Sequence, residues 1–221
     1  ELALEKSNEL LHLFPNSITL HNLLGSIKSN FGKFDEAVGH FKKTLEINSK
    51  YAAGFYNIAL TLQTKGDSAK AIIACKQAIE IKPDFAEAHN NLGNLYYESG
   101  SQALATASYK RAIKVKPDFS AAYYNLGTQQ QERGLFEKAL KNYHQALKHN
   151  PNYTEVKSNI VMLLTNYEPS KDYIHPIKNA DEKIRHLNFR KKNQRKLSDN
   201  SAAKIISEAS EIVNSYDLNI N

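Results

Sequence analysis

Residues 86–119 read AEAHNNLGNLYYESGSQALATASYKRAIKVKPDF, and residues 120–153 read SAAYYNLGTQQQERGLFEKALKNYHQALKHNPNY. The two stretches are each 34 residues long and align without a gap, and the same interval extends back through residues 52–85 and 18–51. Sequence periods of about 20 to 50 residues indicate repeat architectures. The fold is therefore predicted from what recurs at this interval.

Several positions of the interval carry the repeat. The eighth residue is small, the fifteenth is glycine, the twentieth is alanine and the twenty-fourth is the large-residue position. In chain order these residues are Gly25, Ala59, Gly93 and Gly127; Gly32, Gly66, Gly100 and Gly134; Ala37, Ala71, Ala105 and Ala139; and Phe41, Cys75, Tyr109 and Tyr143. The thirty-second residue is proline in the last three intervals, at Pro83, Pro117 and Pro151.

The recurring residues predict two antiparallel helices in each interval. Small residues at positions 8, 20 and 27 let two helix backbones approach, and the residue at position 24 fills the neighbouring space. Glycine at position 15 permits the positive φ that commonly ends a helix, and proline ends the second helix. Because one such hairpin cannot bury both of its faces, the hairpins are expected to stack into an open superhelix with a concave surface.

This pattern resembles the tetratricopeptide repeat (TPR) family, whose unit is a helix-turn-helix of about 34 residues. The resemblance implies an all-α fold: a TPR alpha-solenoid, which is a right-handed superhelix of antiparallel helix pairs, with C-terminal capping or extension helices. The sequence departs from the family at position 11, where the usual aromatic residue is met only by Tyr96. The usual tryptophan at position 4 is replaced by His21, Phe55, His89 and Tyr123.

The repeat frame predicts the domain organisation. Residues 1–17 match only the second helix of a truncated TPR, and residues 154–167 continue the first-helix pattern as a half-repeat or capping helix. Residues 168–221 are expected to be a basic helical extension or the start of a further domain, with an amphipathic helix near residues 202–213. The complete TPRs are expected at residues 18–51, 52–85, 86–119 and 120–153.

Composition excludes several classes of protein. A single cysteine among 221 residues leaves no internal disulfide, so a disulfide-stapled secreted domain is excluded. No apolar run approaches the roughly 18 to 20 residues that a membrane span requires, and the acidic start is unlike a signal peptide. We therefore expect a cytoplasmic protein and, because the chain does not begin with methionine, a fragment of a longer one.

The search for chemical motifs finds no nucleophile elbow, phosphate-binding loop, dinucleotide fingerprint or HExxH zinc motif. His21 and His89 occupy the aromatic position 4, which favours packing over ligand contact. Cys75 occupies position 24, which favours a buried apolar role. We expect no catalytic residue, cofactor or metal, and no enzyme activity, in this chain.

Asparagine recurs at position 6 as Asn57, Asn91, Asn125 and Asn159. The series resembles the asparagine ladder in the TPR arm of O-GlcNAc transferases, which implies that these amides hold the backbone of an extended peptide. A primary amide both donates and accepts hydrogen bonds, so it pairs with a peptide group whatever the side chain. The alternative is that each amide satisfies a neighbouring helix instead.

Positions 2, 5, 9, 12 and 13 of the first helix face the groove in the TPR family, and the resemblance extends this to the present chain. Position 5 lacks the lysine or arginine that a carboxylate clamp for acidic chaperone tails needs, so that mode is not expected. Besides the four asparagines, the predicted groove contains Tyr56, Asn90 and Tyr124 at position 5; Leu60, Asn94 and Thr128 at position 9; and Gln63, Tyr97 and Gln131 at position 12.

The leading hypothesis is a protein-protein interaction scaffold that binds an extended protein or peptide segment. The alternative is the substrate-recruiting N-terminal arm of a larger protein-modifying, glycosyltransferase-like enzyme whose catalytic domain lies outside this chain. The leading half-repeat exposes Leu2, Leu10 and Leu11, which makes it a candidate for self-association.

Residues 183–196 hold seven basic residues and no acidic one. Such a run is a solvated helix face or linker, a contact with a further domain, or a surface for nucleic acid or an anionic membrane. Nucleic acid is the disfavoured partner because only Phe189 is present for base stacking.

Overall fold

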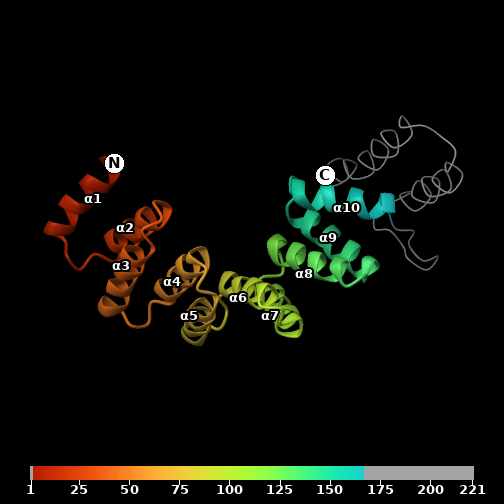
Figure 1. Ribbon diagram of the computed structural model, residues 1–221, viewed down its shortest axis with the longest axis horizontal. Helices are drawn as coiled ribbons and strands as arrows, with labels where there is room; N and C mark the ends of the chain where they lie inside the picture. The colour runs from red at the N-terminus through yellow and green to blue at the C-terminus, as the bar shows by residue number, and fades with distance from the viewer. Residues whose placement is uncertain (1, 167–221) are drawn as a thin grey trace, which may run out of the picture. The chain divides into compact units, whose positions relative to one another are not determined.

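The computed structural model describes residues 2–166 of the 221. These residues form ten α-helices and no strand, so the all-α prediction is confirmed (Figure 1). The predicted extension, with its amphipathic helix and the basic run 183–196, lies outside the described residues. In chain order the helices are α1 (Leu2–Leu13), α2 (Ile18–Asn30), α3 (Phe34–Ile47), α4 (Ala52–Lys65), α5 (Ser68–Ile81), α6 (Ala86–Glu98), α7 (Gln102–Val115), α8 (Ser120–Glu132), α9 (Phe136–His149) and α10 (Thr154–Asn166).

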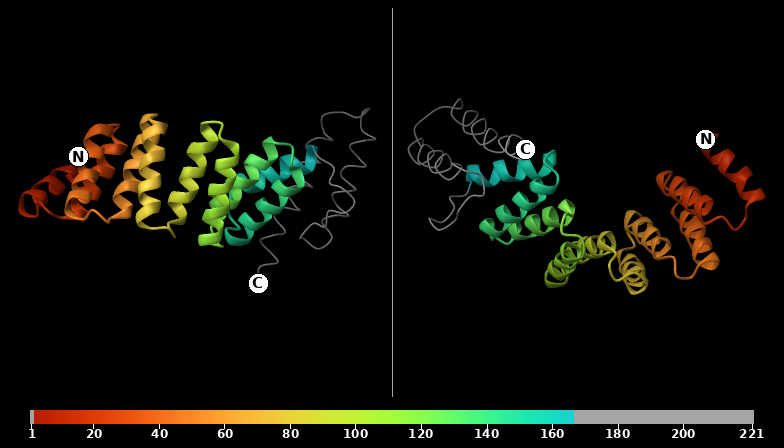
Figure 2. Two further views of the ribbon diagram at one scale, coloured as in Figure 1. Left: turned by 90° about the horizontal axis from the view of Figure 1, so that it is seen from below. Right: turned by 180° about the vertical axis from the view of Figure 1, so that it is seen from behind.

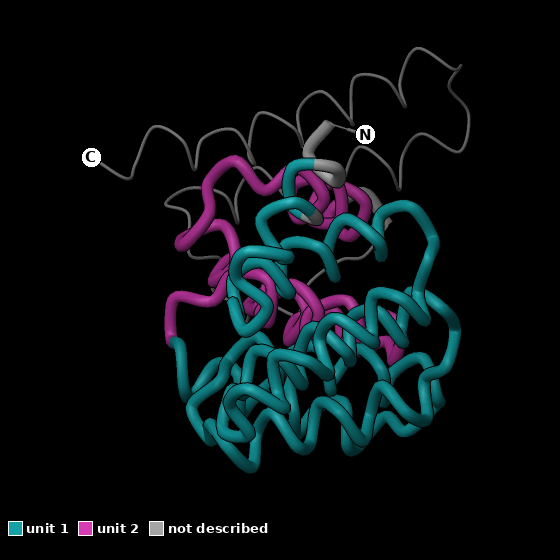
Figure 3. Tube along the Cα trace, turned by 90° about the vertical axis from the view of Figure 1, so that its left-hand side faces the viewer, with its two compact units in different colours: residues 1–116 teal, residues 117–221 magenta. Residues whose placement is uncertain are grey.

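The chain divides between Lys116 and Pro117 into two compact units, coloured separately in Figure 3. Helices α1 to α7 belong to unit 1, and α8 to α10 belong to unit 2. We call the first helix of each repeat the A helix and the second the B helix. Each 34-residue interval contains one A helix and one B helix, and α10 continues the series as a further A helix.

Unit 1 is a stack of antiparallel helix pairs, seen from the side in Figure 2. Within a repeat, α2 packs on α3, α4 on α5 and α6 on α7; between repeats, α3 packs on α4 and α5 on α6. In this unit α2, α4 and α6 form one layer, and α3, α5 and α7 form the other (Figure 1). In unit 2, α8 packs on α9 and α9 on α10. Each B helix of a complete repeat therefore packs against the A helix of its own repeat. The B helices α3, α5 and α9 also pack against the next A helix in the same unit.

Complementary sizes at positions 8 and 24 join the two helices of a repeat. Where position 8 is glycine, an aromatic ring of the B helix occupies the space that a Cβ would need, and the residue that carries this ring is almost fully buried. Repeat 52–85 has the smaller partner Cys75, and its position 8 is Ala59. A methyl group on Gly25, Gly93 or Gly127 would lie 2.6, 2.5 or 2.7 Å from Cε1 of Phe41, Tyr109 or Tyr143, respectively.

The turn inside each repeat uses the glycine at position 15. Gly66 ends α4 with φ of +89°, a left-handed conformation that other residues rarely adopt, and its N–H donates to the Gln63 carbonyl. Asp67 follows and caps α5, because its carboxylate accepts from the Lys70 N–H at 3.3 Å. The other repeats have the same positive φ at Gly32, Gly100 and Gly134.

Candidate peptide-binding face

The side of α4 that turns away from α3 and α5 is partly open to solvent. Ile58, Ala59 and Thr61 are buried, whereas Leu60 is 38% exposed. Steps of three and four residues return to the same side of a helix, so positions 5, 9 and 12 share this face. The remaining groove residues predicted at these positions are all half-buried: Tyr56, Gln63, Asn90, Asn94, Tyr97, Tyr124, Thr128 and Gln131.

In the first, second and fourth repeats the residue at position 5 contacts the last residue of its own repeat. In the first repeat the Asn22 amide nitrogen donates to the Tyr51 hydroxyl at 2.8 Å. In the second and fourth repeats two aromatic rings pack together instead, with tilted ring planes. Their centroids are 4.9 Å apart for Tyr56 and Phe85 and 5.1 Å apart for Tyr124 and Tyr153.

Sequence reasoning missed these partners, although the signal was present. Position 34 is aromatic in every complete repeat, as Tyr51, Phe85, Phe119 and Tyr153.

In the third and fourth repeats the tyrosine at position 24 bonds to the residue at position 9, and in the fourth also to the residue at position 12. The Tyr109 hydroxyl donates to Oδ1 of Asn94 at 2.9 Å. The Tyr143 hydroxyl lies 2.7 Å from Oε1 of Gln131 and 3.3 Å from Oγ1 of Thr128. The partly exposed polar side chains on α6 and α8 are therefore oriented from beneath by buried rings.

The recurring asparagines make hydrogen bonds within the protein. Asn91 is 6% exposed, and its amide nitrogen donates to Sγ of Cys75 at 3.7 Å. The amide nitrogen of Asn159 donates to the hydroxyl of Tyr143 at 3.1 Å. In both cases position 6 of an A helix reaches position 24 of the preceding B helix, so the amide links neighbouring repeats.

For Asn57, position 24 of the preceding B helix is Phe41, whose side chain has no hydrogen-bond acceptor. The amide nitrogen of Asn57 donates instead to Oδ1 of Asn22 at 3.3 Å. Asn125 is half-buried on α8. These bonds agree with the alternative that the amides satisfy a neighbouring helix. An additional contact between the asparagine series and a bound backbone, as in O-GlcNAc transferases, stays a prediction.

The two histidines at position 4 bind the carbonyl of a proline in the preceding turn. Nε2 of His21 lies 3.0 Å from the Pro15 carbonyl oxygen, and Nε2 of His89 lies 2.9 Å from that of Pro83. Since a carbonyl only accepts, each Nε2 carries the hydrogen. Nδ1 of His21 lies 3.2 Å from Nδ1 of His40, so that one imidazole donates a hydrogen bond to the other. Burial, followed by the neighbouring charges of His21 and Lys28, lowers the pKa of His40.

Within residues 2–166, Cys75 and the acidic and histidine side chains show no arrangement typical of a reactive or metal site. Cys75 is fully buried, and this burial raises the pKa of its thiol to about 11, which disfavours the reactive thiolate. Among the described residues, no three histidine, cysteine or acidic side chains come together as metal ligands.

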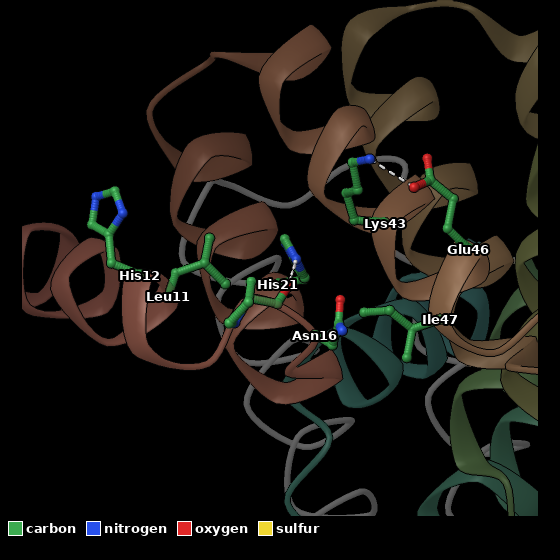
Figure 4. A pocket seen from close by; sticks show the side chains of 8 residues that line it. Leu11, His12, Asn16, His21, Lys43, Glu46 and Ile47 are labelled. Atoms are coloured by element: carbon green, nitrogen blue, oxygen red, sulfur yellow. Dashed lines mark hydrogen bonds and ion pairs between the residues drawn. The ribbon is translucent and has the colours of Figure 1, made fainter.

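A pocket of about 1100 Å³ lies at the N-terminal end of unit 1 (Figure 4). Leu11 and Ile47 form apolar parts of its wall, and Lys43 pairs with Glu46 at 2.6 Å beside them. The remaining lining residues are His12, Pro15, Asn16 and His21. The pocket contains no predicted groove residue.

Leu10 lies on α1 near this pocket and is 44% exposed. Self-association through residues 1–17 stays a prediction.

Family models match several parts of the chain. Tetratricopeptide repeat models match residues 18–51 and 120–153, and a TPR repeat model matches residues 65–100 and 93–134. These matches together cover more than half of the chain. The chain belongs to the TPR family. No curated protein sequence matches this TPR chain.

Solved TPR structures are similar to the chain at low sequence identity. MamA is 24% identical over 69% of this chain and 89% of that chain, with a TM-score of 0.58. YrrB, described as a TPR protein with an unusual peptide-binding site, is 15% identical over 95% and 93%, with a TM-score of 0.58. TTC0263, a TPR protein of Thermus thermophilus, is 20% identical over 71% and 86%, with a TM-score of 0.60. These likenesses show the fold.

No helix within residues 2–166 of this TPR chain is both long enough and apolar enough to cross a membrane.

Proposed function

We propose that this TPR chain is a protein-interaction scaffold that binds an extended segment of a partner along the exposed faces of its A helices. The observation that carries the proposal is the coupling of position 5 to position 34, seen in the Asn22–Tyr51 bond and the Tyr56–Phe85 and Tyr124–Tyr153 contacts. Side chains already held in place lose little freedom when a ligand binds, so their contacts contribute more to affinity. The peptide-binding site described for YrrB supports the same class of function.

The chemistry of this face in unit 1 suits a backbone held in an extended form. Helices α4 and α6 are in contact and present Tyr56, Leu60, Asn90, Asn94 and Tyr97. Packed helices lie about 8 to 10 Å apart, and an extended chain advances about 3.3 Å per residue. One A helix would therefore meet roughly every third residue of the segment, with amides bonding its backbone and rings packing on its side chains.

The test uses the full chain against an array of unstructured peptides, followed by fluorescence anisotropy of the peptides that bind. Leu60→Asp places a charge at the centre of the proposed face, and we expect it to weaken binding at least about ten-fold. Ile73→Asp is the matched control, because Ile73 is also an exposed aliphatic residue, 58% exposed, but lies on the B helix α5. We expect it to leave binding within about two-fold.

Equal losses in Leu60→Asp and Ile73→Asp, or the absence of any saturable peptide, would contradict the proposal. Both changes are at exposed side chains, so circular dichroism of both variants should match that of the parent protein. A quadruple alanine variant of the asparagines at position 6 would be a less specific test. That variant would also remove the internal bonds of Asn57, Asn91 and Asn159.

A further inference from the structure

An aromatic pair occurs at the same place in two of the repeats, one in each unit. Tyr56 packs against Phe85 in unit 1, and Tyr124 packs against Tyr153 in unit 2. All four residues are half-buried, so each keeps some surface in contact with solvent. An accessible aromatic face attracts cations, because the ring quadrupole places negative charge above and below its plane.

A carboxylate follows each pair. Glu87 and Glu155 are the second residues of α6 and α10, two positions after the second ring of each pair. Burial is the main cause that raises the pKa of Tyr56 to about 12, and the charge of Glu87 contributes. The pKa of Tyr153 is raised by burial, by Tyr124 and then by Glu155. Each pair is therefore followed, two residues after its second ring, by a carboxylate that can add its charge to the attraction for a cation.

In unit 1, lysines of the chain itself occupy this environment. Nζ of Lys82 lies 5.0 Å from the centroid of the Phe85 ring. Nζ of Lys116 lies 3.3 Å from Oε1 of Glu87. In unit 1 the ring and the carboxylate thus each interact with a primary ammonium group, one from Lys82 and the other from Lys116.

In unit 2 the corresponding cations are absent from the sequence. The residue two repeat lengths after Lys82 is Asn150, and the residue two repeat lengths after Lys116 is Ile184. Within residues 2–166, no ion pair involves Glu155, which is exposed. Among the residues that the structure describes, the tyrosine pair and its carboxylate therefore lack the two lysine contacts found in unit 1.

The tyrosine pair of unit 2 also has a rigid support. The fully buried Tyr143 ring has its centroid 6.1 Å from that of Tyr124. Its hydroxyl is fixed by Gln131, by Thr128 and by the amide nitrogen of Asn159, which donates to it at 3.1 Å. A platform that is fixed before binding holds its geometry when a ligand arrives.

The geometry points to Tyr124, Tyr153 and Glu155 as a site for one arginine or lysine side chain of the bound segment. Unit 2 therefore selects partners that carry a basic residue in an extended stretch. This inference rests on the proposed function and adds the chemistry of the partner to it. The rings contact the aliphatic stem and the face of the cation, and Glu155 pairs with its charged end.

The test compares peptides recovered from the array with versions in which arginine is replaced by citrulline, its neutral isostere. Binding to the full chain is measured by fluorescence anisotropy. We expect citrulline to weaken binding roughly ten-fold. Glu155→Gln should remove most of this preference, and Glu80→Gln, the same change at an exposed carboxylate of α5, should keep it. Asn150→Lys transplants the lysine of unit 1 and should also remove the preference.

The outcomes separate the two proposals. If peptides bind but arginine and citrulline versions have equal affinity, or if the preference survives in both Glu155→Gln and Asn150→Lys, the cation site is overturned and the peptide-binding function stands. Recovery of only neutral or acidic peptides overturns the cation site in the same way. If no peptide binds, the proposed function itself fails.

Discussion

Replacing Gly93 by alanine should destabilise unit 1, although alanine is the better helix former. The new methyl carbon would lie 2.5 Å from Cε1 and 2.6 Å from Cδ1 of Tyr109, about 1 Å closer than van der Waals contact allows. Tyr109 is 2% exposed and its hydroxyl is bonded to Asn94, so the ring has little room to retreat. Overpacking of this kind costs about 2–3 kcal/mol, and helix propensity returns about 1 kcal/mol. The net loss in the free energy of unfolding is therefore about 1–2 kcal/mol.

The matched control is Gly39→Ala on α3, where an added methyl group meets no atom within 4 Å. The same chemical change should there raise the free energy of unfolding by about 0.5–1 kcal/mol, because only helix propensity is affected. Urea unfolding followed by circular dichroism measures both variants. If Gly93→Ala is as stable as Gly39→Ala, the size complementarity between positions 8 and 24 is refuted.

A double-mutant cycle strengthens the test. Repeat 52–85 pairs Ala59 with Cys75, so Gly93→Ala combined with Tyr109→Cys reproduces a pair that the protein already contains. Tyr109→Cys alone should cost about 3 kcal/mol or more, because it leaves a cavity. In that background Gly93→Ala should become neutral or stabilising, and the coupling energy should favour the double variant by about 1 kcal/mol or more. Additive effects would contradict the structural reasoning.

Three further predictions concern other parts of the chain. Gly66→Ala should cost about 1 kcal/mol although it meets no neighbouring atom, because φ is +89°; urea unfolding should show this loss, and an unchanged midpoint would contradict it. The lowered pKa of His40 means that the folded state binds its proton less readily, so the free energy of unfolding should fall as the pH drops from above the ordinary value of 6.5 to below the lowered value. His40→Asn, which keeps a donor, should flatten this dependence in denaturant unfolding at a series of pH values, and an equally steep profile would refute the assignment. Cys75 should react with a disulfide reagent at mildly alkaline pH only after unfolding in urea, because its pKa is raised to about 11; rapid reaction of the folded protein would show that the thiol is accessible.

The fold could be predicted from the sequence because the recurring residues satisfy steric requirements within a single hairpin. Glycine at position 15 is needed wherever the turn has a positive φ, as at Gly66, and this requirement does not depend on the rest of the molecule. Size complementarity of the Gly93–Tyr109 kind also acts within one hairpin. Requirements of this kind repeat with the hairpin, so a 34-residue period reveals them.

The candidate site was harder to predict because its side chains have partners elsewhere in the sequence. The asparagine at position 6 allows two interpretations, a contact with a bound peptide or with a neighbouring helix. The partner of Asn91 is Cys75 of the preceding repeat, which a comparison of equivalent positions does not show. Position 34 marks the end of a repeat, and the repeat pattern alone does not specify that the Tyr153 ring contacts Tyr124. Partners of this kind depend on how two helices pack, which side-chain identities alone do not specify.

The amide that joins consecutive hairpins also limits how the chain can be rearranged. The size-matched pair at positions 8 and 24 is internal to a hairpin and would travel with it if that hairpin were transplanted. The asparagine of the next hairpin needs an acceptor at its upstream junction, which Cys75 and Tyr143 provide and Phe41 does not. If the hairpins were placed in a different order, the first hairpin would have to precede one whose asparagine finds another acceptor. The order of the hairpins is therefore part of what the sequence specifies.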